Sequence, residues 1–306
     1  MWELGDRWWP ATILLFAPRY FLLVPLSVLV PAAALLRRPL LSLLFVTALV
    51  AIFPVMGFRT GWRTWLASRP SGPRFKIVTF NVDGGEMIAP LLPDILREWA
   101  PDLVAFQECG DALVDAIQRL EGWYHRERGW LCFVSRYPVA ETAAPEEFFL
   151  GDIGSTGSAS RYDVTTPGGI IHYVNVHLET PRKGLEPLLE SGNLGRMAGN
   201  TMLRDLGSRR IRAWVDSIPG ALVISGDFNM PVESVIYRRY WGDLGNAFSQ
   251  AGHGVGGSRA QARVGVRIDH VLFREGWRAL SAHLGPDLGS DHRPMFAELE
   301  WVGGGP

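Results

Sequence analysis

The sequence predicts an α/β domain that follows an apolar N-terminal segment. Three observations support this prediction. Short β-branched runs alternate with helical segments between residues 75 and 301, polar side chains follow several of these runs, and residues 11 to 58 are almost entirely apolar. With 306 residues, 47% of them hydrophobic, the chain has enough material for one large core or two modest ones.

The apolar N-terminal segment predicts a hairpin of two membrane-spanning helices over residues 21 to 36 and 40 to 58, the first extending back toward residue 11. At about 1.5 Å per residue the second reaches roughly 28 Å, near the thickness of a bilayer's hydrocarbon core. Arg37-Arg38-Pro39 would form the turn. A cleaved signal peptide fits less well, because the apolar region is too long and restarts after the double arginine. We therefore expect a membrane anchor over residues 1 to 66, with the lipid bilayer as its partner.

The side of the membrane that carries the C-terminal part is left open. The positively charged residues on the side of the C-terminal part outnumber Arg37 and Arg38 in the turn. This count favours a cytoplasmic location for the C-terminal part. A third short helix over residues 10 to 18 would reverse this count. We expect the plasma membrane as the location and a Pro- and Gly-rich linker over residues 67 to 74, followed by the catalytic domain over residues 75 to 302.

Periodicity places the secondary structure of the C-terminal part. The expected strands cover residues 75 to 82, 103 to 106, 131 to 135, 158 to 166, 170 to 181, 221 to 224, 266 to 273 and 295 to 299. The expected helices cover residues 87 to 99, 111 to 120, 192 to 216 and 234 to 241.

The apolar strand over residues 221 to 224 leads into Gly226-Asp227-Phe228-Asn229. Asp227 and Asn229 leave the sheet edge with period two, so both side chains point the same way. An isolated Gly-Asp-x-Asn is more often an Asx-rich turn. The residues that accompany this stretch elsewhere in the chain favour a site that holds a water or a phosphate.

Other strands also end in polar side chains. A carboxylate that follows a fully apolar strand, as Glu108 does, is costly unless it has a partner, a metal or water. His177 alone would be read as a satisfied core histidine, whereas a histidine that follows an aspartate beside a buried strand, as His292 does, suggests proton transfer. The polar residues at strand ends are Asn81, Glu108, His177, Asp227, Asn229, Asp269, Asp291 and His292.

These groups are better explained as one site than as separate features. Polar groups gathered without partners would cost several kcal/mol. Carboxylate and amide oxygens without cysteine suit Mg²⁺ or Mn²⁺. The sequence therefore predicts a divalent-cation site that also binds phosphate.

Charge and cysteine content limit the alternatives. A net charge of −1 argues against a strongly basic surface for nucleic acid, although local patches remain possible. Cys109 and Cys132 lie in apolar segments without metal-ligand spacing, and we expect buried free thiols rather than a disulfide.

In order along the chain, the motifs Thr-Phe-Asn, Gln-Glu, Asn-x-His-Leu, Gly-Asp-Phe-Asn, Arg-Ile-Asp-His and Ser-Asp-His-Arg-Pro resemble those of the endonuclease/exonuclease/phosphatase superfamily. That superfamily includes deoxyribonuclease I, abasic-site endonucleases, neutral sphingomyelinases and inositol polyphosphate 5-phosphatases. The resemblance spans about residues 75 to 301. It implies a deoxyribonuclease I-like, four-layer α-β-β-α sandwich, here in a membrane-anchored, bacterial-type member.

The resemblance also implies roles for the residues that hold the metal and activate water. Glu108 resembles the main metal ligand, helped by Asn81 and with Asp291 as a further partner. His292 resembles the general base, and Asp269 fixes its tautomer.

The remaining roles concern the substrate. Asp227 would orient or deprotonate the attacking water, and Asn229 would hold a phosphate oxygen. His177 matches the second histidine of the deoxyribonuclease and sphingomyelinase branches, which stabilises the transition state or assists the leaving group. It disfavours the abasic-site branch, and Arg267-Ile268-Asp269 departs from the 5-phosphatase pattern.

We therefore expect a membrane-anchored, Mg²⁺- or Mn²⁺-dependent phosphoric ester hydrolase, a phosphodiesterase or phosphatase. Its substrate would be a phosphate ester of a lipid, nucleotide or nucleic acid, with a membrane-adjacent ester favoured by the anchor. No obligate protein partner is expected. The alternatives are a metal-dependent endonuclease or exonuclease and a non-catalytic binding module on the same fold.

Overall fold

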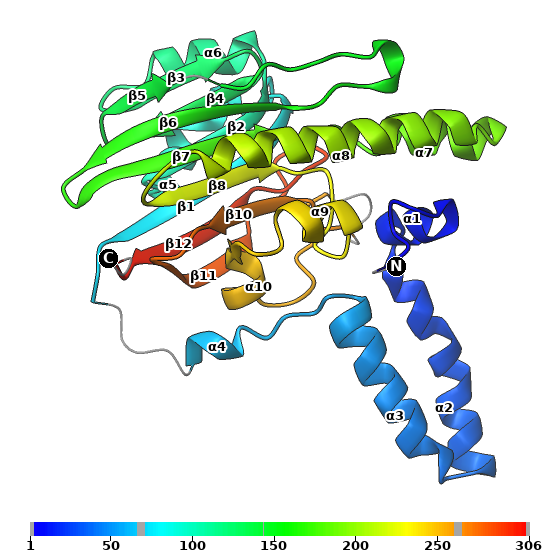
Figure 1. The fold of residues 1–306 in the computed structure, drawn as a ribbon. Coiled ribbons are helices and arrows are strands. Elements are labelled where there is room, and N and C mark those ends of the chain that lie inside the picture. Colours follow the sequence, from blue (N-terminus) through cyan, green and yellow to red (C-terminus); the bar gives the residue numbers. More distant parts are fainter. Residues whose placement is uncertain (1–2, 66–70, 143, 260–264, 304–306) are drawn as a thin grey trace.

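The computed structural model describes residues 3 to 65, 71 to 142, 144 to 259 and 265 to 303. Two six-stranded sheets dominate these residues (Figure 1). The first has the order β11-β12-β1-β2-β4-β3 and the second β5-β6-β7-β8-β10-β9. Both are mixed, because β1 pairs with β2 and β7 pairs with β8 in parallel while the other pairs are antiparallel.

The first sheet is formed by β1 (Arg74–Gly84), β2 (Leu103–Cys109), β3 (Tyr124–Arg128), β4 (Leu131–Ser135), β11 (Trp277–Leu284) and β12 (Met295–Trp301). The second is formed by β5 (Val139–Thr142), β6 (Ser158–Thr166), β7 (Gly169–His177), β8 (Leu222–Asp227), β9 (Gly245–Asn246) and β10 (Asp269–Phe273). The helices of this part are α5 (Leu92–Trp99), α6 (Asp111–Gln118), α7 (Arg182–Ser191), α8 (Leu194–Asp216), α9 (Val235–Tyr240) and α10 (Ala247–Ala251).

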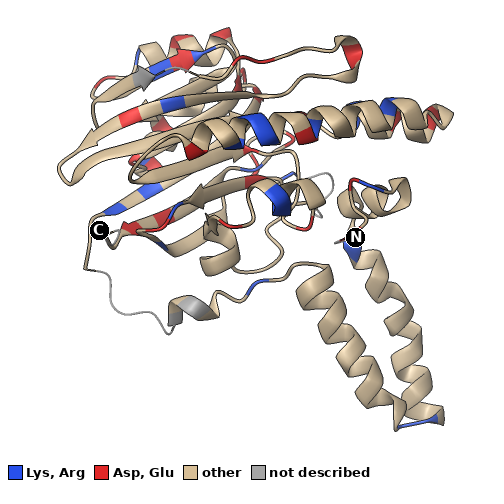
Figure 2. Ribbon diagram, in the orientation of Figure 1, with Lys and Arg blue, Asp and Glu red and all other residues tan. Residues whose placement is uncertain are grey.

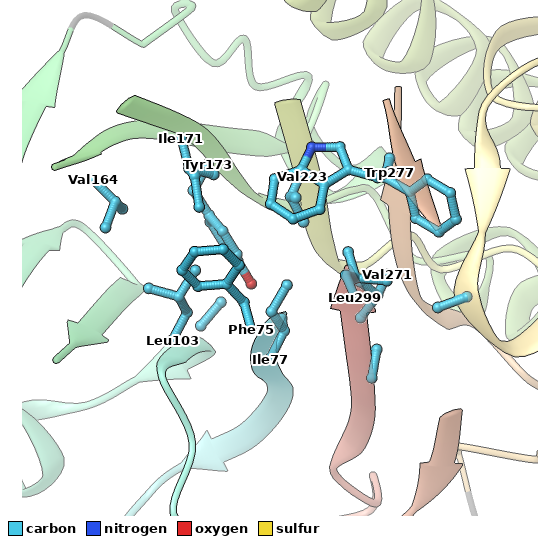
Figure 3. Packing of buried hydrophobic residues seen from close by; sticks show 14 of the residues in the cluster. Phe75, Ile77, Leu103, Val164, Ile171, Tyr173, Val223, Val271, Trp277 and Leu299 are labelled. Carbon is cyan, nitrogen blue, oxygen red and sulfur yellow. The ribbon is translucent and has the colours of Figure 1, made fainter. Parts of the chain in front are cut away.

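Three buried clusters define the layers. One fills the space between the two sheets (Figure 3). In this cluster Phe133 of the first sheet stacks on Tyr162 of the second, with ring centroids 4.4 Å apart. The second lies between the second sheet and the helices α8 and α9, and the third lies between the first sheet and α5 and α6. This helix, sheet, sheet, helix order is consistent with the deoxyribonuclease I-like sandwich that the sequence predicts.

The N-terminal part adds α1 (Trp9–Phe16), α2 (Val24–Leu36), α3 (Leu40–Val50) and α4 (Trp62–Trp65). A 3₁₀ turn precedes α2 and a π turn, Ala51–Val55, continues α3. The stretch Arg19–Leu36 is long and apolar enough to cross a membrane, by length and composition alone, and 6% of it is buried; Leu40–Val55 is apolar but shorter. In Figure 1, α2 and α3 lie side by side and extend away from the sheets.

Most predicted elements exist, with shifted ends, while β3, β5, β9, β11, α4, α7 and α10 were not anticipated. The strands β3 and β5 lie at sheet edges, and their compositions are polar in β3 and mixed in β5. The division into an anchor, a linker and a catalytic domain stays a prediction, and residues 66 to 70 of the expected linker lie outside the described part of the chain.

The prediction of free thiols is wrong, because Cys109 and Cys132 form a disulfide. β2 and β4 are antiparallel neighbours, and Cys109 donates its N–H to the Trp130 carbonyl, which brings the two Cα atoms to 6.0 Å. The spacing of 23 residues gives no sign of this, because sheet pairing rather than local sequence brings the sulfurs together.

Candidate active site

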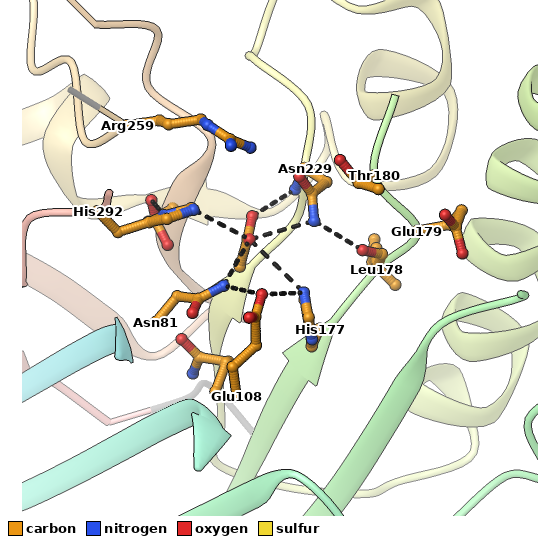
Figure 4. A network of polar contacts seen from close by, with 12 residues as sticks. Asn81, Glu108, His177, Leu178, Glu179, Thr180, Asn229, Arg259 and His292 are labelled. Carbon is orange, nitrogen blue, oxygen red and sulfur yellow. Dashed lines mark hydrogen bonds and ion pairs between the residues drawn. The ribbon is translucent and has the colours of Figure 1, made fainter. Parts of the chain in front are cut away.

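Strand ends from both sheets meet at one edge of the sandwich (Figure 4). Asn81 lies in β1 and Glu108 in β2 of the first sheet, and His177 and Asp227 end β7 and β8 of the second. In the parallel pairs Asn81 lies beside Gln107 and His177 beside Asp227. The register therefore carries these polar side chains to a common edge, which the sequence alone leaves undetermined.

Asp227 is the centre of the cluster and is buried. Its Oδ2 accepts a hydrogen bond from Asn81 Nδ2 at 3.2 Å, and it lies 3.7 Å from His177 Nε2 and 3.6 Å from His292 Nε2. Asn229 donates its backbone N–H to Oδ1 at 2.8 Å and its Nδ2 to Oδ2 at 3.1 Å. Asp227 is thus fixed by amides and faces two imidazoles.

His292 is held in place by Asp269, whose Oδ2 lies 2.8 Å from His292 Nδ1. This contact leaves Nε2 directed at Asp227. Burial alone would lower the pKa of His292, but Asp269, Asp227 and Asp291 raise it to about 10. Burial, with Asp269, raises the pKa of Asp227 to about 6 against the opposing pull of the two histidines. In the field of the chain's own groups, His292 therefore carries a proton at neutral pH.

Two site residues have backbones in the left-handed region, Glu108 at φ 54° and Asn229 at φ 51°. This conformation is uncommon for residues other than glycine, and such strain clusters at functional sites. It turns the Glu108 carboxylate toward Asn81 Nδ2, 2.8 Å away, and leaves the side chain 41% exposed. Glu108 is therefore the carboxylate of the cluster most open to a ligand.

Gly226 explains why a glycine precedes Asp227. A Cβ at this position would lie 1.9 Å from the Val176 carbonyl oxygen, and its φ is 144°. Only glycine lets β8 approach β7 this closely, and that approach places Asp227 beside His177.

A buried polar bridge joins the sheets beneath the cluster. Gln107 Nε2 in β2 donates to Asn175 Oδ1 in β7 at 2.7 Å, and Asn175 Nδ2 donates to the Phe106 carbonyl at 2.9 Å. Both side chains are fully buried, so breaking one bond would leave an unsatisfied partner. The bridge fixes the spacing between the Glu108 side and the His177 side of the site.

The donor set fits a hard divalent cation. Asn229 Oδ1 and Asp269 Oδ1 are buried and have no hydrogen-bond partner among the described residues. Asp227, Asp269 and His292 offer ligand atoms within 4.8 Å of one another, although Asp269 is already bonded to His292. Oxygen donors of this kind suit Mg²⁺ or Mn²⁺. Asn81 here points its Nδ2 at Glu108, and turning the amide would present Oδ1 instead.

Asp291 lies farther out than the other predicted residues. Its Oδ2 is contacted by Arg259 at 2.7 Å and by Arg182 at 3.3 Å, while Oδ1 lies 3.6 Å from His292 Nε2. Two guanidinium groups compete with a cation for this carboxylate, and its role as a metal ligand stays a prediction.

The residues at the rim of the site were not predicted from the sequence. Figure 4 shows one of them, Arg259, beside the cluster. A cleft of about 510 Å³ opens over Glu108 and His177, and Arg182, Lys183 and Arg259 line it. Trp130 and Phe149 line the same cleft with exposed fractions of 66% and 75%. The available signal was that Trp130 and Phe149 lie outside the strands and helices expected from the sequence. Each of the three cations is paired with a carboxylate of the same cleft, Arg182 and Arg259 with Asp291 and Lys183 with Glu179. The cleft therefore offers a rim of paired charges and an apolar one.

A model described as "Endonuclease/Exonuclease/phosphatase family" matches residues 78–292. Among solved structures, an endonuclease/exonuclease/phosphatase family protein from Bacteroides thetaiotaomicron superposes with a TM-score of 0.54 at 13% identity, over 75% of this chain and 98% of that one. TDP2 from D. rerio, complexed with a single-strand DNA product, gives 0.53 at 16% identity over 74% and 99% of the two chains.

A 3'-5' exonuclease, NExo, from Neisseria meningitidis gives a TM-score of 0.51 at 19% identity, over 74% of this chain and 100% of that one. At these identities the similarity establishes the fold. No curated protein matches the sequence.

Proposed function

The chain belongs to the endonuclease/exonuclease/phosphatase family, and we propose that it is a membrane-anchored phosphoesterase that requires Mg²⁺ or Mn²⁺. One observation carries the proposal: Glu108 and Asn81 from one sheet meet His177 and Asp227 from the other, with His292 beside them, and a cleft opens over Glu108, His177 and His292. A stability role does not explain two buried carboxylates of one sheet, Asp227 and Asp269, close to the exposed carboxylate of Glu108 from the other.

Glu108 and Asn81 would hold the cation, with Asp227 at its side. When bound, the cation neutralises negative charge on the phosphoryl oxygens and on the leaving oxygen. Phosphoryl transfer depends mainly on this stabilisation and on positioning.

Asp227 would accept the proton of the attacking water. Its pKa, raised to about 6, leaves it ionised at neutral pH yet basic enough to act. His292, which its carboxylate neighbours keep protonated, would donate Nε2–H to a phosphoryl oxygen. This assignment of roles to Asp227 and His292 departs from the expectation that His292 is the general base. The negative charge of the carboxylates around the His292 ring opposes loss of its proton.

His177 would contact the other side of the phosphate. His177 Nε2, which lies between Glu108 and Asp227 at 3.5 and 3.7 Å, is placed to donate to the leaving oxygen. Asn229 donates Nδ2 to the Leu178 carbonyl and to Asp227 Oδ2, so no N–H of its amide is free for a phosphate oxygen, and it would instead position Asp227.

The rim and the anchor favour a substrate that has an apolar part and lies near a membrane. Arg182, Lys183 and Arg259 would attract the phosphate, and Trp130 with Phe149 would contact apolar groups beside it. The same aromatic residues could stack on nucleobases, so a nuclease is the second candidate.

The first test measures hydrolysis of bis(p-nitrophenyl) phosphate by the purified full chain with and without Mg²⁺ or Mn²⁺. Glu108→Gln should reduce the rate by about a thousandfold, in the range lost with a catalytic carboxylate. Glu121→Gln, at an exposed position, is the matched control. Full activity of Glu108→Gln would refute the site, and absence of cation binding by calorimetry would favour the non-catalytic module.

The substrate class requires a separate panel. Phosphoinositides, sphingomyelin and single- and double-stranded DNA are assayed side by side with the same preparation. We expect turnover of a lipid phosphate ester, whereas turnover of DNA alone would establish the nuclease.

The disulfide bears on the side of the membrane. Such bonds persist in oxidising compartments and are rare in the cytosol. We therefore propose that the catalytic domain lies outside the cytoplasm, against the count of positive charges. A cysteine placed by Glu121→Cys should react with a membrane-impermeant maleimide in intact cells, and one placed by Arg38→Cys in the hairpin turn should not. The reverse labelling pattern would contradict the assignment.

A further inference from the structure

A second cavity, of about 470 Å³, lies between the N-terminal helices and the catalytic part. One wall comes from residues 17 to 20, just before α2, and from Met56 and Gly57, just after α3. The other comes from residues 231 to 233 and from the loop that contains Val255. In Figure 2 the charged residues of the α2 and α3 segment lie at its ends. Because residues 17 to 20, Met56 and Gly57 line the cavity, it lies at the end of this segment nearest the sandwich.

Arg267 lines this cavity and is only 6% exposed. Its Nη2 donates to Ser249 Oγ at 3.3 Å, and its guanidinium lies 4.6 Å from the Phe248 ring centroid. Nε and Nη1 have no acceptor within the part of the chain that the structure describes. A buried guanidinium with two unmatched nitrogens is costly, and an anion would remove that cost.

The neighbouring charges do not supply the anion. Glu233 is the one carboxylate on the cavity wall among the described residues, and Arg19 already binds it at 3.0 Å. Arg59 and Arg19 both lie near enough to act on Arg267. Burial lowers the pKa of Arg267 to about 10, Glu233 opposes this shift, and the two arginines add to it. Three guanidinium groups around a single carboxylate leave an excess of positive charge.

The geometry points to a binding site for the phosphate of an anionic phospholipid in this cavity. If α2 and α3 enter a bilayer, the cavity lies at the level of the lipid head groups, where phosphates are the nearest anions. Arginine is well suited to phosphate because its planar fork donates two parallel hydrogen bonds. Arg267 would bind the phosphate, and Arg19, held by Glu233, would add charge at the entrance.

This inference rests on the membrane attachment proposed above but not on the chemistry of the cleft. The lipid would act as a fixed ligand that joins the anchor to the catalytic part. The substrate would bind elsewhere, over Glu108 and His177.

The experiment uses the full chain in an uncharged detergent, freed of lipid and kept in EDTA so that hydrolysis is absent. It is titrated with dihexanoyl phosphatidylglycerol, dihexanoyl phosphatidylcholine and inorganic phosphate. Native mass spectrometry counts bound lipid, and calorimetry gives the affinities. We expect one phosphatidylglycerol per chain, bound about tenfold more tightly than either other probe, since net charge and acyl chains both contribute.

Variants locate the binding. Arg267→Met should weaken phosphatidylglycerol binding by about tenfold or more, the loss expected for a charge-assisted contact. His177→Asn, in the catalytic cleft, should leave it unchanged. Val255 is 36% exposed on the cavity wall, so Val255→Glu should weaken binding and Val255→Lys should strengthen it. Val302→Glu, at an exposed valine outside the cavity, is the matched control.

If Arg267→Met does not fold, the opposite effects of the two Val255 variants decide alone. Equal binding of phosphatidylcholine or of inorganic phosphate would overturn the inference, as would an unchanged affinity in Val255→Glu. Membrane fractionation separates the two proposals. A chain that stays in membranes but does not bind phosphatidylglycerol refutes this inference only, whereas a chain that leaves membranes refutes the anchor.

Discussion

The N-terminal helices and the sandwich use the same apolar residue types in opposite ways. In the sandwich, apolar side chains such as Phe133 are fully buried between layers. In α2 and α3 they point outward, with Leu35 86% and Phe45 64% exposed. A soluble protein rarely exposes so large an apolar surface. The sandwich therefore buries its apolar side chains within the chain, whereas the proposed membrane hairpin would bury them in a bilayer.

The two parts are joined by polar contacts. Arg204 of α8 binds Asp6 at 2.9 Å, both fully buried, and Ser234 Oγ donates to the same aspartate at 2.6 Å. Arg204 also donates to the Asn229 carbonyl at 3.4 Å. The N-terminal segment is therefore linked through Arg204 to the loop that carries Asn229 of the candidate site.

The largest effect should come from the polar edge of the sandwich. Asp227→Asn should lower kcat by about a thousandfold, because the group that accepts the proton is lost. It should leave the free energy of unfolding unchanged or higher, since a buried carboxylate beside Asp269 disappears. Hydrolysis assays and thermal melts of the same preparation test both. A large loss of stability with little loss of rate would show that Asp227 is structural.

A matched pair of phenylalanine substitutions tests the contrast between the regions directly. Phe133→Ala should cost about 3–5 kcal/mol, because it opens a cavity between the sheets. Phe45→Ala in α3 should cost less than about 0.5 kcal/mol, as expected for an exposed position. Chemical denaturation in detergent measures both. Equal losses would mean that α3 is packed against protein rather than lipid.

Membrane insertion should be sensitive to charge in α2 and insensitive to it in the sandwich. Val28→Asp places a carboxylate at a site that is 69% exposed and should cost about 2.5–3.5 kcal/mol of insertion free energy. Val302→Asp should have no such effect. The fraction of protein recovered with membranes after expression is the measurement, and equal recovery of both variants would contradict a spanning helix.

The smallest effect concerns acid stability. Burial, followed by Arg267, lowers the pKa of His270 from 6.5 to about 3, and its Nε2 lies 3.0 Å from the Met230 carbonyl. At a pH between these two pKa values, His270 binds a proton in the unfolded state but not in the folded state. Its contribution to the free energy of unfolding is therefore fully present above pH 6.5 and is lost as the pH decreases. The loss should reach about 2 kcal/mol at pH 5.

His270→Gln is the comparison for this effect. The variant should unfold with a flatter pH dependence between pH 6.5 and 5 than the parent, whatever its absolute stability. Parallel curves for the two proteins would show that His270 is not the titrating group.

Most strands of the sandwich could be predicted because their apolar runs are continuous and bounded by turn residues. Edge strands such as β3 and β5 could not, because one side of each is unpaired and their side chains are polar or mixed. The polar strand ends could be named in advance, from Asn81 to His292. Their distances and protonation could not, because these depend on how deeply Asp227 and Asp269 are buried.

The sequence by itself determined which groups are present: two apolar helices with charge only at their ends, and an ordered series of carboxylates, amides and histidines after buried strands. These are local patterns, fixed by neighbours a few residues apart. The tertiary structure alone decided the pairing of Cys109 with Cys132, the bridge from Gln107 to Asn175, and the unmatched guanidinium of Arg267. Each of these joins or surrounds residues distant in the chain, and sheet order and register, which no local pattern encodes, bring them together.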